Sequence, residues 1–155
     1  VVMAGDGQMD VEDLEGVIKP IISGDFHHVK GDRSIHSDGL SKMPILRKVG
    51  TALLAFLTTL ACGRKIRDPQ CGYTATSFRI LRYWDWKRSW KGYGYPNWWL
   101  MELTRKKYAI SQVPVRAIYD GQKSGLSIPS FLVRVAPMLL LAYINAHFLG
   151  YKMTW

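Results

Sequence analysis

Apolar and polar residues alternate along this chain in blocks typical of helices and strands in turn. From residue 46 to residue 60, apolar residues recur at helical spacing, after Pro44 and before Gly63, which predicts one long helix. The same patterns predict helices over 11–19 and 98–107 and strands over 25–30, 73–79 and 108–119. Alternating strands and helices indicate an α/β fold with a mixed sheet, whose ligands lie at the carboxyl ends of the strands.

The first ten residues join an apolar run to side chains that carry oxygen. The run of residues 1–3 stops at Ala4, and Asp6 and Gln8 follow on either side of a glycine. This pattern predicts a buried strand that delivers carboxylate and amide oxygens, ligands that Mg²⁺ and Mn²⁺ prefer, to an open sheet edge. The alternative is a strand that ends in a turn with a polar cap. Because the chain opens inside this apolar run, we expect a fragment that lacks part of the fold upstream.

Residues 131–151 form a mostly apolar stretch, interrupted by Arg134 and Pro137 among others. A membrane-spanning helix needs about 20 predominantly apolar residues, so this stretch is barely long enough. Three interpretations remain open: a transmembrane helix, a helix in the membrane interface, and an ordinary core helix. We expect residues 1–128 to form the α/β part of the chain and residues 129–155 a membrane-associated or transmembrane helical segment.

Charge and composition narrow the class of partner. Lys and Arg total 21 against 12 Asp and Glu, a formal net charge of +9, so phosphates or an anionic membrane surface are natural partners. The basic residues are scattered and form no run, and we expect no specific nucleic-acid binding. The six Trp and eight Tyr fit base stacking, a core or a membrane interface. Cys62 and Cys71 lack the spacing of a metal site or a disulfide framework, which predicts two small buried side chains in a reduced protein.

Several charged residues lie at or near the ends of predicted strands. Arg33 follows a strand end and a glycine, where its guanidinium can bind phosphate in a bidentate manner; a surface arginine beside Asp32 is the alternative. Asp68 precedes a proline in a tight turn and is either a general base or ligand support, or only a turn former. Arg116 and Lys123 surround a glycine-containing loop that suits a lid over a phosphorylated ligand, or a solvated loop.

In chain order, these segments resemble the family-two glycosyltransferases, and within them the polyprenyl-phosphate branch that is similar to dolichol-phosphate mannosyltransferase. The matching motifs are residues 3–10 (MAGDGQMD), 29–33 (VKGDR), 43–47 (MPILR), 68–74 (DPQCGYT), 94–97 (GYPN) and 113–125, which includes VPVR and KSG. The resemblance covers about residues 1–128. It implies the C-terminal part of a GT-A nucleotide-diphospho-sugar transferase domain with a mixed sheet, followed by a C-terminal apolar helix.

The resemblance further implies a hexosyltransferase that moves a sugar from a nucleotide-sugar donor to a polyprenyl or dolichyl phosphate. In the family, the opening motif holds a divalent metal and the diphosphate of the donor. Asp6 and Gln8 match two of its positions and are the implied ligands of Mg²⁺ or Mn²⁺, whereas Ala4 replaces an aspartate. The family's upstream half, which recognises the nucleotide base and ribose, has no counterpart here, which is why we expect an N-terminally truncated fragment.

The remaining roles are also implied by position in the family motifs. The implied substrate-binding residues are Arg33, Arg47, Arg116, Lys123 and Ser124. Asp68 and Arg33 are implied at the reacting centre, with Asp68 in a supporting role. The expected protein is membrane-associated, with its catalytic part on the cytoplasmic side. The alternative function, favoured by Ala4, is a non-catalytic basic module that retains the fold and binds the membrane surface.

Overall fold

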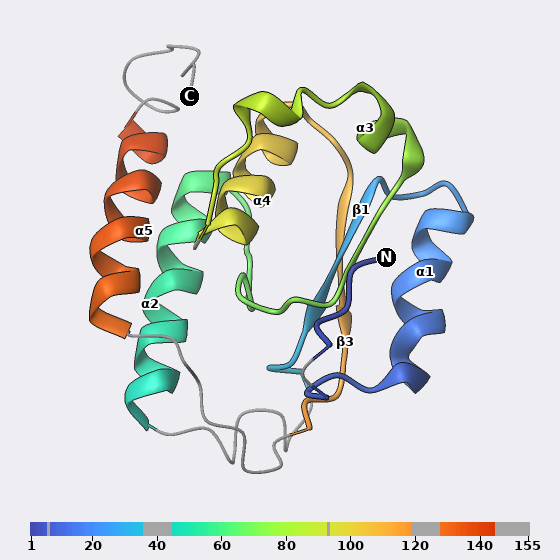
Figure 1. Ribbon diagram of the computed structural model, residues 1–155, viewed down its shortest axis with the longest axis horizontal. Helices are drawn as coiled ribbons and strands as arrows, with labels where there is room; N and C mark the ends of the chain where they lie inside the picture. The colour runs from blue at the N-terminus through green and yellow to red at the C-terminus, as the bar shows by residue number, and fades with distance from the viewer. Residues whose placement is uncertain (6, 36–44, 93, 119–127, 145–155) are drawn as a thin grey trace.

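The computed structural model shows a three-stranded sheet with helices on both of its faces (Figure 1). It describes residues 1–155 except 6, 36–44, 93, 119–127 and 145–155. The elements in chain order are η1 Val11–Asp13, α1 Leu14–Ile22, β1 His28–Asp32, α2 Ile45–Cys62, β2 Thr74–Thr76, α3 Phe78–Tyr83, η2 Trp86–Arg88, α4 Tyr95–Arg105, β3 Ile110–Pro114 and α5 Ile128–Ile144. The expected α/β architecture with a mixed sheet is confirmed.

The central strand β1 fixes the geometry of the sheet. Its neighbours are β2, which is antiparallel to it, and β3, which is parallel to it. Val29 is opposite Ala75 on one side and Ser111 on the other, and all five residues of β1 are buried. Because β1 and β3 are parallel, their carboxyl ends meet at one edge, where Asp32 is opposite Pro114. The first residue after β3, Val115, accordingly donates its backbone N–H to the carbonyl oxygen of Asp32 at 3.2 Å.

Two apolar clusters form the core, one on each face of the sheet. The cluster on the α1 side contains the buried residues Val17, Val29, Cys71, Tyr73, Ala75 and Val115. The larger cluster joins the other face to α4, α2 and α5, and its members include Leu54, Cys62, Ile66, Trp84, Trp98, Trp99, Ile110 and Leu139. Both cysteines are buried and unbonded to each other, as predicted. Three of the tryptophans are therefore core residues.

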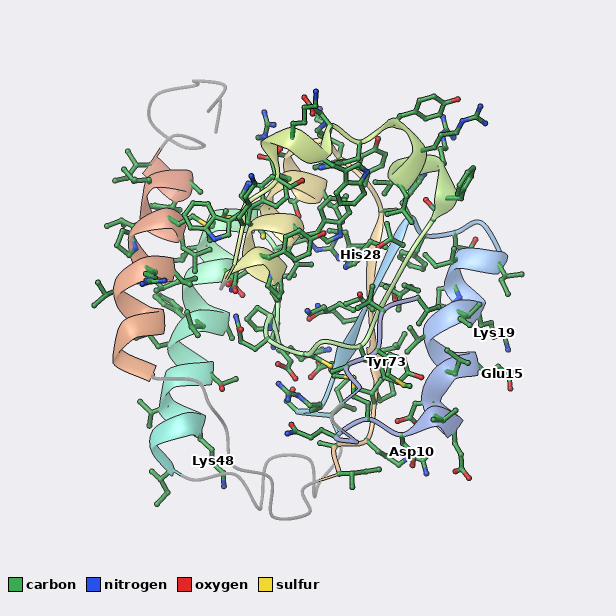
Figure 2. The ribbon with its side chains drawn as sticks, in the orientation of Figure 1. Asp10, Glu15, Lys19, His28, Lys48 and Tyr73 are labelled. Carbon is green, nitrogen blue, oxygen red and sulfur yellow. The ribbon has the colours of Figure 1, made fainter. Side chains whose placement is uncertain are left out.

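Polar side chains on β1 face the helical layer opposite α1. His28 is buried, its Nδ1 lies 2.8 Å from Oγ1 of Thr76, and its ring meets Trp99 edge-on. Figure 2 places His28 at the opposite end of the sheet from Asp10. Burial, reinforced by the charge of Lys30, lowers the pKa of His28 to about 3, so the imidazole is neutral at pH 7.

Most predicted elements are present, with shifted boundaries. The predicted long helix is α2, and the predicted strands over 25–30 and 108–119 are the shorter β1 and β3. The strand expected over 73–79 is wrong at its end, since α3 begins at Phe78. Ser77 takes an extended conformation at the N-cap of α3, and its carbonyl accepts from the backbone N–H groups of Ile80 and Leu81. This cap stops the strand and starts the helix.

The opening segment is not the buried strand expected from its sequence. Val1, Val2 and Met3 are exposed, and Val2 forms an isolated antiparallel bridge with Thr74. This bridge lies beside β2, at the outer edge of the described sheet, and none of the three side chains joins either core cluster. The two backbone hydrogen bonds between Val2 and Thr74 nevertheless keep the segment aligned with the sheet.

The described part of the mostly apolar stretch at residues 131–151 belongs to the helix α5. Arg134 is exposed within α5, and residues 145–155 lie outside the described part. Val135, Met138 and Leu139 of α5 are buried in the core cluster, because α5 packs along α2. In the part of the chain that the structure describes, no helix is both long enough and apolar enough to cross a membrane.

Replacement of Gly31 by alanine is expected to destabilise the fold by about 1–3 kcal/mol, because the core has no room for a methyl group here. A Cβ at this position would lie 2.9 Å from Cγ2 of Val115 and 3.0 Å from both Sγ of Cys71 and the carbonyl oxygen of Tyr73. Gly16→Ala in α1 is the control, since its Cβ meets nothing within 4 Å. Urea unfolding of both variants measures the effect; equal free energies of unfolding would contradict it.

The buried histidine predicts a specific acid sensitivity. The pKa of His28 is lower in the folded protein than the unfolded value of 6.5, so the unfolded chain binds the extra proton first. Stability from His28 is therefore complete above pH 6.5 and is lost progressively as the pH falls toward 3. Relative to His28→Gln, the wild-type protein should lose up to about 1.4 kcal/mol per pH unit between pH 6 and pH 4. Urea unfolding at each pH measures the free energy of unfolding of both proteins. If this free energy depends on pH in the same way for both, the assignment is refuted.

Candidate functional site

A buried ion pair lies at the carboxyl edge of β1. Arg33 follows β1 directly, and Asp68 belongs to the turn that leads into β2. Nε of Arg33 lies 2.7 Å from Oδ2 of Asp68, and Nη2 lies 3.0 Å from Oδ1, which is a bidentate pair. The backbone N–H of Arg33 also donates to Oδ2 at 3.3 Å. Arg33 and Asp68, predicted separately from two motifs, are thus one unit.

Lys30 interacts electrostatically with this pair, and it is almost completely buried. Its ammonium donates to the carbonyl oxygen of Cys71, in the same turn as Asp68. Burial lowers the pKa of Lys30 to about 8, although the charge of Asp68 opposes this shift. Burial would raise the pKa of Asp68, but the hydrogen bonds and charge of Arg33, with the charge of Lys30, hold it below its usual value. Asp68 is therefore an anion that positions cations and is a poor proton acceptor at pH 7.

A second acidic residue, Asp32, faces the same turn. Its Oδ1 accepts from the backbone N–H and the hydroxyl of Ser34, at 2.9 Å and 2.5 Å. Its Oδ2 is buried without a hydrogen bond and lies 3.6 Å from Nη1 of Arg67. The backbone N–H of Arg67 donates to Oε1 of Gln112 on β3 at 2.8 Å, so β3 fixes the start of this turn.

The charges at this edge favour a bound anion. Three basic side chains, Lys30, Arg33 and Arg67, are associated with two acidic ones, Asp32 and Asp68. The surplus positive charge is partly enclosed by protein, which strengthens its attraction for a phosphate. The arrangement can bind and orient a phosphate through its basic side chains.

A hydrogen-bonded chain connects this turn to the helices, and sequence reasoning missed it. The amide of Gln70 donates to Oδ1 of Asn97, the fully buried side chain in the first turn of α4. Nδ2 of Asn97 donates to Oγ1 of Thr58 at 2.7 Å, and that hydroxyl donates to the carbonyl oxygen of Leu54 at 2.6 Å. The motif at residues 94–97 contained Asn97, but no signal in the sequence identified its partners on α2.

Arg116 lies in a separate, acidic environment. Its Nε is 3.1 Å from Oδ1 of Asp13, and its Nη1 is 3.1 Å from Glu12 and 3.2 Å from Asp10. Asp10 also caps η1, since its Oδ1 accepts a 3.0 Å hydrogen bond from the backbone N–H of Glu12. The carbonyl oxygen of Gln8 accepts from the backbone N–H of Ile118 at 3.0 Å. The segment after β3 is therefore joined to the opening motif.

The structure brings together only some of the predicted site residues. Arg33 and Asp68 form one unit, whereas Arg116 contacts the carboxylates around η1, and Gln8 lies beside residue 118. Asp6, Lys123 and Ser124 lie outside the described residues, and so does the side chain of Arg47. Among the residues described, no group of three or more His, Cys, Asp or Glu side chains could hold a metal. The roles assigned from the motifs therefore stay predictions.

Two curated archaeal proteins are similar to this chain. The chain is 32% identical over 119 residues to a UDP-N-acetylglucosamine--dolichyl-phosphate N-acetylglucosaminyltransferase of Methanococcus voltae, which covers 77% of the chain and 47% of that protein. It is 25% identical over 114 residues to an uncharacterised protein of Methanocaldococcus jannaschii, covering 74% of the chain and 47% of that protein. The chain thus spans about half the length of the curated relatives it matches.

Other comparisons find no match. No protein-family model matches the chain, and no solved structure matches it. The similarity to a named transferase suggests a glycosyltransferase relative, in agreement with the resemblance of the ordered motifs.

Proposed function

We propose that this protein is a glycosyltransferase that moves a sugar from a nucleotide diphosphate to a polyprenyl or dolichyl phosphate. The observation that carries the proposal is the Arg33–Asp68 pair, buried at the carboxyl edge of β1 within a surplus of positive charge. The similarity to an N-acetylglucosaminyltransferase that acts on dolichyl phosphate supports the same chemistry. A hexose derivative as the transferred sugar and a GT-A type of fold are parts of this proposal.

The proposed reaction suits a site of cations without a strong base. A lipid phosphate oxygen is already anionic, so it attacks the anomeric carbon of the sugar without losing a proton first. Catalysis then depends on holding the two substrates in line and on stabilising the departing diphosphate. Arg33 orients the acceptor phosphate, and Asp68 holds the guanidinium of Arg33 in place through two hydrogen bonds. Asp68 is thus a positioning residue in this mechanism.

A divalent metal is the proposed cofactor, with Asp6 and Gln8 as its protein ligands. Carboxylate and amide oxygens fit Mg²⁺ or Mn²⁺, and diphosphate oxygens commonly complete the coordination of these ions. The hydrogen bond from the backbone N–H of Ile118 to the carbonyl oxygen of Gln8 supports this proposal, because Ile118 follows β3, whose parallel partner β1 ends at the arginine site. When bound, the metal would neutralise charge on the leaving diphosphate.

The membrane is the proposed location of the acceptor, with the catalytic part on the cytoplasmic side. Apolar side chains are exposed along one side of α2, at Ile45, Val49, Leu53 and Phe56. Val133, Leu140 and Leu141 are exposed on α5, which lies beside α2 on the flank opposite α1 (Figure 1). An apolar helix face with basic residues nearby, such as Arg134, is typical of a helix that lies in the membrane interface. The interfacial interpretation is therefore the one we propose.

Transfer activity should require a divalent metal and the carboxylate of Asp6. Membranes that contain the full-length protein should transfer radiolabelled sugar to a polyprenyl phosphate with Mg²⁺ or Mn²⁺, and a chelator should abolish transfer. Asp6→Asn should reduce transfer at least about 100-fold, because the loss of a metal ligand removes charge stabilisation. Glu15→Gln, on the exposed side of α1, is the control. Metal-independent transfer would contradict the cofactor assignment, and no transfer with any common sugar nucleotide would favour a non-catalytic membrane-binding module.

The exposed face of α2 should determine membrane binding. Phe56→Glu should weaken binding to vesicles of phosphatidylglycerol and phosphatidylcholine about tenfold, since the buried area of one large apolar side chain is lost. Phe78→Glu is the matched control, because Phe78 on α3 is 72% exposed, compared with 58% for Phe56, and lies outside this face. Co-sedimentation measures both variants, and an equal loss for the two would refute the proposed orientation.

A further inference from the structure

We propose that Arg67 is an additional binding residue for a phosphate oxyanion of the substrates, held ready by Asp32. This inference deepens the proposed function and rests on it. The matching motif in this turn begins at Asp68, and no other matching motif includes residue 67, so the resemblance assigns no role to Arg67. The contact of its guanidinium with Asp32, the residue before Arg33, carries the inference.

The backbone at Arg67 is fixed at the carboxyl edge of the sheet. The N–H of Arg67 donates to Oε1 of Gln112 at 2.8 Å. Nε2 of Gln112 in turn donates to the carbonyl oxygen of Lys65, also at 2.8 Å. Gln112 lies on β3 and is paired with Lys30 of β1. One side chain on β3 therefore anchors the turn from both sides. This anchoring holds the start of the Arg67 side chain next to Asp68.

The guanidinium of Arg67 contacts Asp32 only loosely. Nη1 lies 3.6 Å from Oδ2, which is beyond hydrogen-bond length, and Oδ2 has no hydrogen bond although Asp32 is fully buried. The side chain of Arg67 is 45% exposed, so an incoming ligand can reach it. At this distance the carboxylate of Asp32 attracts the guanidinium but forms no hydrogen bond with it. The N–H groups of the guanidinium can therefore donate to an anion.

Arg33 and Arg116 differ from Arg67 because their guanidinium groups already form hydrogen bonds. Arg33 is bound in a bidentate manner to Asp68, and Arg116 makes hydrogen bonds to Asp13 and Glu12. Of these three arginines, Arg67 alone has a guanidinium with no hydrogen bond among the described residues. Phosphate oxygens match its planar fork and would replace a long contact by short charge-assisted hydrogen bonds.

The test measures anion binding separately from catalysis. Isothermal calorimetry with farnesyl phosphate as a phosphate monoester, and with inorganic diphosphate, compares the wild-type protein with Arg67→Gln. We expect the dissociation constant of at least one probe to rise about three- to tenfold, as for a partly exposed charged hydrogen bond. A change for farnesyl phosphate alone assigns Arg67 to the acceptor, and a change for diphosphate alone assigns it to the donor.

Two further variants make the result specific. Arg67→Lys keeps the charge without the planar fork and should show an intermediate loss. Lys65→Gln removes a positive charge two residues away on an exposed side chain and should bind both probes as the wild type does. Equal binding by wild type and Arg67→Gln, equal losses for Lys65→Gln and Arg67→Gln, or no binding of either probe by the wild type would overturn the inference. Normal anion binding without sugar transfer in the membrane assay would instead refute the proposed function.

Discussion

The buried pair of Arg33 and Asp68 ties the end of β1 to the turn before β2, and the rest of the site depends on it. Removing one partner of such a pair leaves an uncompensated buried charge, which typically costs about 3–5 kcal/mol. The pair also fixes the position of the Arg33 guanidinium, because Arg33 donates three hydrogen bonds to the carboxylate of Asp68. Lys30 adds a fourth link between β1 and this turn, through the carbonyl oxygen of Cys71.

The two faces of β1 explain how charged residues are tolerated so close to the core. Val29 points into the apolar cluster beneath α1, whereas His28 and Lys30 point toward the other face. Gly31, without a side chain, lets the segment of Cys71 and Tyr73 approach, and its N–H donates to the carbonyl oxygen of Tyr73 at 2.8 Å. This close approach brings the turn that contains Asp68 within reach of Arg33. A substitution at Gly31 would therefore disturb the core and the site together.

The sequence predicted the local features of this arrangement better than its long-range contacts. Helical spacing located α2, and the motifs identified Arg33 and Asp68 as residues near strand ends. Neither signal could show that the two side chains bind each other across 35 residues, because the pairing depends on sheet topology. The contact of Arg116 with Asp13, across 103 residues, was missed for the same reason. The opening run appeared buried from its composition, but burial requires a layer over it, which composition alone cannot reveal.

The proposed membrane face and the proposed phosphate site are compatible in position. Lys48, in the first turn of α2, lies at the same end of the molecule as Asp10, which is the end where β1 terminates (Figures 1 and 2). The exposed apolar side of α2 begins at Ile45, so the proposed membrane face extends to the end of the molecule at which the arginine edge lies (Figure 2). The helix N-terminus adds partial positive charge there. A lipid phosphate could thus reach the arginine edge while its hydrocarbon chain stays in the membrane.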